Sequence, residues 1–211
     1  MAPLRSLGNI FSAFDDFYAR TGKDAVTPAP IPDVTATGGT KSNYGVNTIH
    51  QLKASGSLVF PDAFNKDIFY VVIGGGGGGG ADIAGGGGAG AWRQGSMPVT
   101  GPVTFPVSIG AGGAGGPYPS NDGTAGGDTT FTIPTGTPIV SPGGGKGSRG
   151  ASGGPGGSGG GGYGRARYNC GGSSGNGAAH TGSGGGANGN GTAAGSGGSG
   201  LVVVRYVIEP A

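Results

Sequence analysis

The residues best suited to binding chemistry form a short polar and aromatic run inside a long glycine tract. The run is Tyr163-Gly164-Arg165-Ala166-Arg167-Tyr168-Asn169, and Lys146 and Arg149 occur in a comparable loop. Tyrosine faces can stack on sugars, and guanidinium forks pair with carboxylate or phosphate. These residues therefore predict a site for an anionic cell-surface glycan. The alternative interpretation is that they are solvated connections between glycine segments, or contacts with a neighbouring copy of the chain.

The sequence contains no motif that assembles a catalytic or cofactor site. His50 and His180 lie in different contexts, without carboxylates nearby in the sequence, and Cys170 is the single cysteine. One cysteine excludes a cysteine-cluster metal site and an intrachain disulfide. The run 144–148 resembles a phosphate-binding loop, but Gly147 separates the lysine from the serine that must follow it. We expect a protein that is not an enzyme and uses no cofactor or metal.

Composition and charge exclude further classes of function. The 211 residues include 57 glycines and 15 prolines, and the formal net charge is only +2. A charge this small gives no argument for a nucleic-acid partner. The sequence also lacks the roughly 18 consecutive apolar residues that a membrane-spanning helix needs. Neither nucleic-acid binding nor membrane insertion is expected.

Apolar strands bracket the glycine-rich part of the chain. All but six of the 57 glycines lie within residues 74–200, which the apolar runs 68–73 and 201–208 enclose. Runs of β-branched residues bounded by chain-breaking residues predict strands, and these two runs are expected to pair. The full set of expected strands is 33–37, 48–54, 57–60, 67–73, 103–109, 128–133 and 201–208.

The glycine tracts between these strands contain too much glycine for an α-helix or an ordinary strand. They lie at 74–80, 85–90, 110–116, 143–164 and 171–200. Helices of the polyproline type have three residues per turn and no internal hydrogen bonds, so their backbone groups must pair between segments. A dense lattice of such bonds would offset the extra entropy of ordering glycine. We therefore predict a mainly β fold with a sandwich of polyglycine type II helices.

The N-terminal region predicts a separate arm. Residues 4–20 carry an apolar stripe at spacings of three and four, typical of one face of a short α-helix. The stripe consists of Leu7, Ile10, Phe11, Phe14, Phe17 and Tyr18. The proline-rich run 27–32 cannot continue a helix. We expect domains at 1–32 (the anchor arm), 33–73 (a small β subdomain) and 74–211 (the glycine-rich domain). The stripe would dock on another subunit or a larger assembly, or else fold back on the body.

The strand junctions resemble those of a known family. Tyr70-Val71-Val72-Ile73 enters the tract 74–80, the runs 85–92 and 107–116 follow, and 197–206 closes with Leu201-Val202-Val203-Val204. In order and spacing they resemble the glycine-rich domain of phage tail-fibre adhesins. The runs 35–40 and 49–60 are similar to the opening of glycine-rich structural proteins of marine phages. The resemblance covers residues 34–208 and implies strands flanking packed polyglycine type II helices, with variable loops at one end that contact the host.

The resemblance implies a non-catalytic structural protein at the virion surface. The apolar stripe of residues 7–18 would be its virion anchor. Its receptor-binding loop would consist of Lys146, Arg149, Tyr163, Arg165, Arg167, Tyr168 and Asn169. The implied partners are tail or capsid proteins and a host glycan, and a homo-oligomer is expected. The resemblance favours a tail-fibre or tail-tip adhesin, whereas direct attachment by a short arm favours a capsid decoration protein. A cellular structural or ice-binding glycine protein would leave the aromatic stripe unexplained.

Overall fold

The computed structural model describes residues 34–119, 122–149, 152–161, 175–188 and 192–208. The chain divides into two compact units, Met1–Asp33 together with Ala211, and Val34–Pro210. All described residues belong to the second unit. The expected N-terminal helix, with its anchor residues Leu7, Ile10, Phe11, Phe14, Phe17 and Tyr18, lies outside the described residues. The anchor arm therefore stays a prediction.

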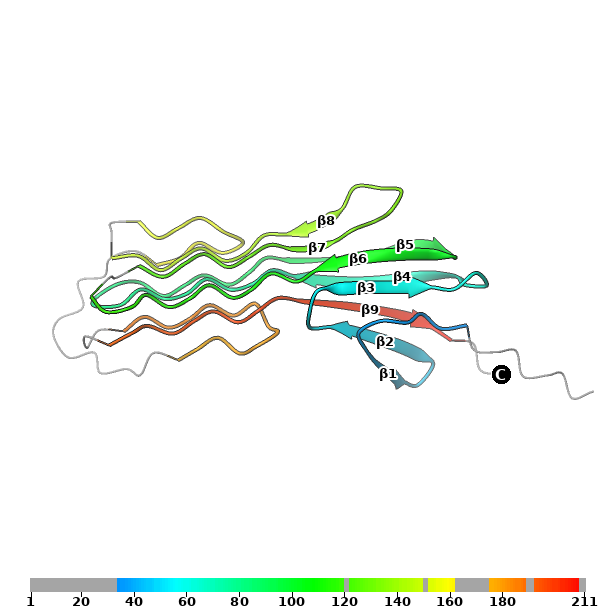
Figure 1. The fold of residues 1–211 in the computed structure, drawn as a ribbon, viewed down its shortest axis with the longest axis horizontal. Helices are drawn as coiled ribbons and strands as arrows, with labels where there is room; N and C mark the ends of the chain where they lie inside the picture. The colour runs from blue at the N-terminus through cyan, green and yellow to red at the C-terminus, as the bar shows by residue number, and fades with distance from the viewer. Residues whose placement is uncertain (1–33, 120–121, 150–151, 162–174, 189–191, 209–211) are drawn as a thin grey trace, which may run out of the picture. The chain divides into compact units, whose positions relative to one another are not determined.

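The larger of two antiparallel sheets has five strands in the order β1-β2-β9-β4-β5 (Figure 1). They are β1 Thr40–Tyr44, β2 Asn47–Leu52, β4 Asn65–Ile73, β5 Trp92–Thr100 and β9 Leu201–Val207. β4 and β9 are neighbours, with Val71 opposite Val203. The predicted pairing of the two apolar runs that enclose the glycine tracts is confirmed.

The smaller sheet has four strands in the order β3-β6-β7-β8. They are β3 Gly56–Phe60, β6 Val103–Ser108, β7 Thr129–Phe131 and β8 Ile139–Ser141. Leu58 in β3 pairs with Phe105 in β6, and both side chains are buried. Their neighbours Ser57 and Thr104 are exposed, as expected for strands with one face in a core and one in solvent.

The core lies between the two sheets and is rich in aromatic side chains. The Phe60 and Phe64 ring centroids are 4.5 Å apart, and those of Phe105 and Phe131 are 5.2 Å apart. Tyr206 meets the Phe64 ring edge to face at 5.0 Å. Contacts of this kind contribute beyond the apolar area that they bury. This core fixes the strand ends from which the glycine segments start.

Six expected strands are present, with small shifts at their ends, as β2, β3, β4, β6, β7 and β9. The stretch 33–37 contributes only an isolated bridge between Thr37 and Val59. The strands β1, β5 and β8 were not predicted. β5 contains Gly95 and Pro98, which argue against a strand in sequence, but an edge strand tolerates a proline. The mainly β fold is confirmed, and the described residues contain no helix.

Candidate functional site

The glycine segment 74–80 continues directly from β4 and lies at the centre of a hydrogen-bonded lattice. Its N–H groups donate to three neighbouring segments in rotation. The segment 85–91 accepts from every third residue, with the bonds Gly74 to Ala91, Gly77 to Gly88 and Gly80 to Gly85. The segment 124–127 accepts from Gly78 and Gly75, at Thr124 and Gly127. The segment 195–198 accepts from Gly79 and Gly76, at Gly195 and Gly198. Each neighbour is reached at every third residue, and each runs antiparallel to the central segment.

The carbonyl groups of the same segment accept hydrogen bonds from three further segments. Gly144 and Gly147 donate to Gly75 and Gly78, Gly113 and Gly116 donate to Gly76 and Gly79, and Gly185 and Asn188 donate to Gly77 and Gly80, with N···O distances of 2.7–3.2 Å. These three segments run parallel to the central one. Six segments therefore surround 74–80 and satisfy both peptide groups of every residue from Gly75 to Gly80, as buried backbone requires.

The close approach of the segments requires glycine at the centre of the lattice. A Cβ added at any residue from Gly74 to Gly79 would meet a backbone carbonyl oxygen well inside 3.0 Å, a separation that real Cβ atoms essentially never show. The clashing oxygens belong to different neighbours in turn, such as Ala111 for Gly75 and Gly145 for Gly77. No single neighbour could move aside to admit side chains along the segment.

Several of the segments reverse direction in loops at the end away from the sheets (Figure 1). Gly80 donates to Gly85 across the loop 81–84, and Gly116 donates to Gly79 just before the next loop. Gly123, which follows that loop, donates to Gly147. Loops far apart in sequence are thus gathered at one end of the lattice.

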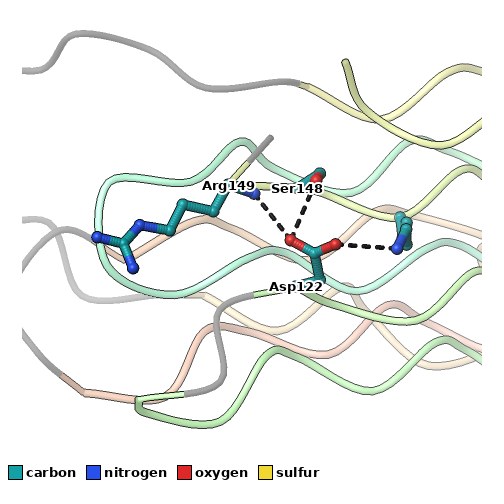
Figure 2. Close-up of polar contacts among 4 residues, drawn as sticks. Asp122, Ser148 and Arg149 are labelled. Atoms are coloured by element: carbon teal, nitrogen blue, oxygen red, sulfur yellow. Dashed lines mark hydrogen bonds and ion pairs between the residues drawn. The ribbon is translucent and has the colours of Figure 1, made fainter. Parts of the chain in front are cut away.

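Asp122 ties two of these loops together (Figure 2). One carboxylate oxygen accepts from the Lys146 ammonium at 2.9 Å. The other accepts from the Ser148 hydroxyl at 3.0 Å and from the Arg149 backbone N–H at 2.9 Å. The Lys146 ammonium, followed by the Arg149 N–H, holds the pKa of Asp122 below its ordinary value. With both oxygens engaged, the carboxylate acts as a brace between loops.

A second aspartate pairs with Arg149. The Arg149 guanidinium lies 3.4 Å from a carboxylate oxygen of Asp82, in the loop after the central segment. Both ion pairs are partly exposed, and such pairs contribute little to stability. Their effect is to fix the positions of Lys146 and Arg149 and to occupy their charges.

The structure brings together only part of the predicted glycan-binding loop. Lys146 and Arg149 meet through Asp122, whereas Tyr163, Arg165, Arg167, Tyr168 and Asn169 lie outside the described residues. The Ser148 N–H donates to the carbonyl of Gly161, so the last described residue before that run lies beside the Asp122 brace. Sequence reasoning missed Asp82 and Asp122 as partners. The available signal was that each acidic residue interrupts a glycine tract at a loop.

The two histidines make structural contacts. His180 donates its backbone N–H to the Ser199 hydroxyl, which lies 3.0 Å from Nδ1 of the same histidine. His50 is fully buried, with Nδ1 2.8 Å from the Gly38 carbonyl and Nε2 3.2 Å from the Tyr206 hydroxyl. A carbonyl can only accept, so Nδ1 carries the proton and Nε2 accepts from Tyr206. Burial lowers the pKa of His50, the Gly38 carbonyl opposes that shift, and Lys41 adds to it.

The described residues form neither a metal-binding cluster nor a membrane-spanning helix. No group of three or more histidine, cysteine, aspartate or glutamate side chains lies close enough there to hold a metal ion. No helix in that part of the chain has the length and apolar character to cross a membrane.

Comparison with known proteins identifies a glycine-rich domain in this chain. The family model described as a glycine-rich domain matches residues 53–173, which is more than half of the chain. The match begins before β3, takes in the central segment and extends past the Asp122 brace. No curated protein matches the chain significantly. By the family match, the chain belongs to the glycine-rich domain family.

Proposed function

We propose that this chain is a non-catalytic structural protein of a phage virion, which holds a set of loops at the particle surface for host adsorption. The observation that carries the proposal is the six-neighboured glycine segment 74–80, because it turns a glycine-rich sequence into a closely packed body. The role at a virion rests on the resemblance of the strand junctions to phage tail-fibre adhesins.

We infer that the glycine segments are polyglycine type II helices. Such helices have three residues per turn and no internal hydrogen bonds. Gly74, Gly77 and Gly80 all donate to one neighbour, as residues on one side of a three-fold helix would. The intervening residues donate to two other neighbours, as the other two sides would. The period of three supports the assignment.

Loops on a rigid scaffold are where binding residues are commonly found. Several of the loops that connect the segments lie together at the end away from the sheets, and residues 162–174 connect Gly161 with Gly175. Because Lys146 and Arg149 already pair with aspartates, we assign receptor contact to Tyr163, Arg165, Arg167, Tyr168 and Asn169. The proposed ligand is an anionic glycan of the host surface, bound by tyrosine stacking and guanidinium pairing.

Immunogold labelling of intact particles with an antibody against the glycine lattice tests the location. Label confined to the tail supports the adsorption role, label over the head makes the chain a capsid decoration protein, and unlabelled particles contradict the virion proposal. In a parallel experiment, Phe14→Ser with Phe17→Ser should abolish incorporation into particles while the purified protein keeps its melting temperature. Normal incorporation of that double variant would contradict the anchor role.

A further inference from the structure

The two sheets differ in what they present on their outer faces. On the four-stranded sheet, the outward residues of β3 and β6 are mostly small or polar: Ser57, Val59, Thr104, Pro106 and Ser108. On the five-stranded sheet, the outward positions of the neighbouring strands β4 and β9 carry large apolar side chains: Phe69, Val71, Ile73, Leu201, Val203 and Val207. Only the smaller sheet thus shows the alternation typical of a solvated sheet face.

Apart from Asp67 and Arg205 on the outer face, the central parts of β4 and β9 are apolar on both faces, a pattern typical of strands that are covered on both sides. Their inward residues Ile68, Val72, Val202 and Val204 fill the core. Their outward residues are left partly open: Phe69 and Val207 each keep 44% of their surface exposed. At the margin of the same face, Trp92 keeps 63% exposed. An exposed apolar patch of this kind marks an interaction surface.

Polar residues surround this apolar centre. Ser42 and Asn47 lie on the β1 and β2 side, and Gln94 and Ser96 lie on the β5 side. A groove of about 590 Å³ crosses the face and is lined by Ile49, Phe69, Tyr70, Val71, Gln94, Gly95, Ser96, Val203 and Arg205. An apolar centre with a polar rim is the usual anatomy of a protein interface.

The charges on this face complement each other. The Arg205 guanidinium lies over the Phe69 ring, 4.7 Å from its centroid, and Asp67 is two residues from Phe69 on the same face of β4. Among the described residues neither Arg205 nor Asp67 forms an ion pair. A two-fold axis between them would place Arg205 of one copy against Asp67 of the other, as a self-complementary interface requires.

We propose that the outer face of the five-stranded sheet is the interface between two copies of this chain, packed face to face. Five strands about 4.8 Å apart, with about seven residues at 3.4 Å each, cover about 600 Å² in plan. Because side chains project from the sheet, the accessible area of this face is larger than its planar area and approaches the value of about 800 Å² per partner in a standard interface. This inference rests on the sheet and not on the virion role.

Sedimentation velocity of the purified full chain tests the interface over about a hundredfold range of concentration, because dimer population depends on protomer concentration. The wild type should form dimers. Phe69→Thr, which keeps a strand-forming residue, should raise the dimer dissociation constant by about tenfold or more, as loss of a central aromatic contact does. The matched control is Val140→Thr, since Val140 in β8 is 43% exposed but belongs to the other sheet. It should leave the dimer unchanged.

Charge exchange identifies the contact without removing apolar area. Arg205→Glu should weaken the dimer because it places two acids together, and Arg205→Glu combined with Asp67→Arg should restore it. A thermal melt by circular dichroism checks that each variant is folded. A monomeric wild type overturns the proposal, and so does a dimer that neither Phe69→Thr nor Arg205→Glu weakens. These measurements use purified protein, so their result is independent of where label falls on particles.

Discussion

Two adjacent glycines provide a direct test of the lattice. Gly86 and Gly87 lie in the same segment, which runs antiparallel to 74–80. A Cβ at Gly87 would meet the Gly77 carbonyl oxygen far inside 3.0 Å, whereas a Cβ at Gly86 would find its nearest atom, the Gly185 oxygen, at 3.4 Å. Neither glycine has a positive φ that would itself disfavour alanine. The two substitutions therefore differ in interior contact alone.

The cost of Gly87→Ala follows from the movement that it forces. Segments 85–91 and 74–80 must separate by on the order of 1 Å, because nonbonded atoms settle about 3.5 Å apart. That separation lengthens the bonds from Gly77 to Gly88 and from Gly80 to Gly85, now 2.8 and 2.9 Å. Overpacking costs about 1–3 kcal/mol and each lost bond about 1 kcal/mol, so we expect a loss of about 3–5 kcal/mol. The melting temperature should fall by on the order of 10 °C.

Thermal and urea unfolding followed by circular dichroism measure both variants. Gly86→Ala should change the unfolding free energy by less than about 1 kcal/mol, and the lower entropy of its unfolded chain acts to stabilise it. Gly56→Ala is a second control, since nothing lies within 4 Å of a Cβ there. Equal effects of Gly86→Ala and Gly87→Ala would refute the close-packed arrangement of these segments.

Three further predictions concern buried and bridging polar groups. Burial lowers the pKa of His50 in the folded state, whereas in the unfolded chain this pKa stays at about 6.5. The free energy of unfolding should therefore be highest above about pH 6.5 and should decrease as the pH falls below that value. A free energy of unfolding that urea titrations show to be constant across this range would contradict the assignment. Tyr206→Phe removes the hydroxyl that accepts from the Ala36 N–H at 2.8 Å and donates to His50, and should cost about 1–3 kcal/mol by the same measurement. Asp122→Asn should lower the free energy of unfolding by about 1 kcal/mol or less. The difference between this variant and the wild type should decrease as added salt screens the ion pair of Asp122 with Lys146.

The strands that enclose the glycine could be predicted because they carry local signals. β4 and β9 are continuous runs of β-branched and aromatic residues, and their pairing followed from that pattern. β1 and β5 carry no such signal, with polar residues throughout β1 and Gly95 and Pro98 in β5. They form strands because each pairs with a neighbouring strand, β1 with β2 and β5 with β4. That is a tertiary effect which propensity cannot reveal.

The sequence predicted the cations of the candidate site but not the aspartates with which they pair. Lys146 and Arg149 were conspicuous as cations in a stretch without acidic residues, which favoured an anionic ligand. Their partners Asp122 and Asp82 are 24 and 67 residues away in sequence. Only the return of successive segments to the same end of the lattice brings those charges together. Because glycine occupies almost every position of these tracts, the sequence does not determine the register in which one segment pairs with the next.

The dependence of the lattice on its flanking sheets follows from the energetics of glycine. Each residue from Gly75 to Gly80 makes two intersegment bonds, one as donor and one as acceptor. Each bond is shared by two residues, so at about 1 kcal/mol net per bond the gain is about 1 kcal/mol per residue. Ordering a backbone residue costs about 1–2 kcal/mol, and glycine costs about 0.5–1 kcal/mol more than alanine. With no side chains to bury, the segments do not offset this cost on their own. The apolar sandwich of Phe60, Phe105, Phe131 and Tyr206 must therefore supply the remainder, by fixing the strand ends from which the adjoining segments start. A lattice separated from its sheets should lose its order, although every glycine contact within it is unchanged.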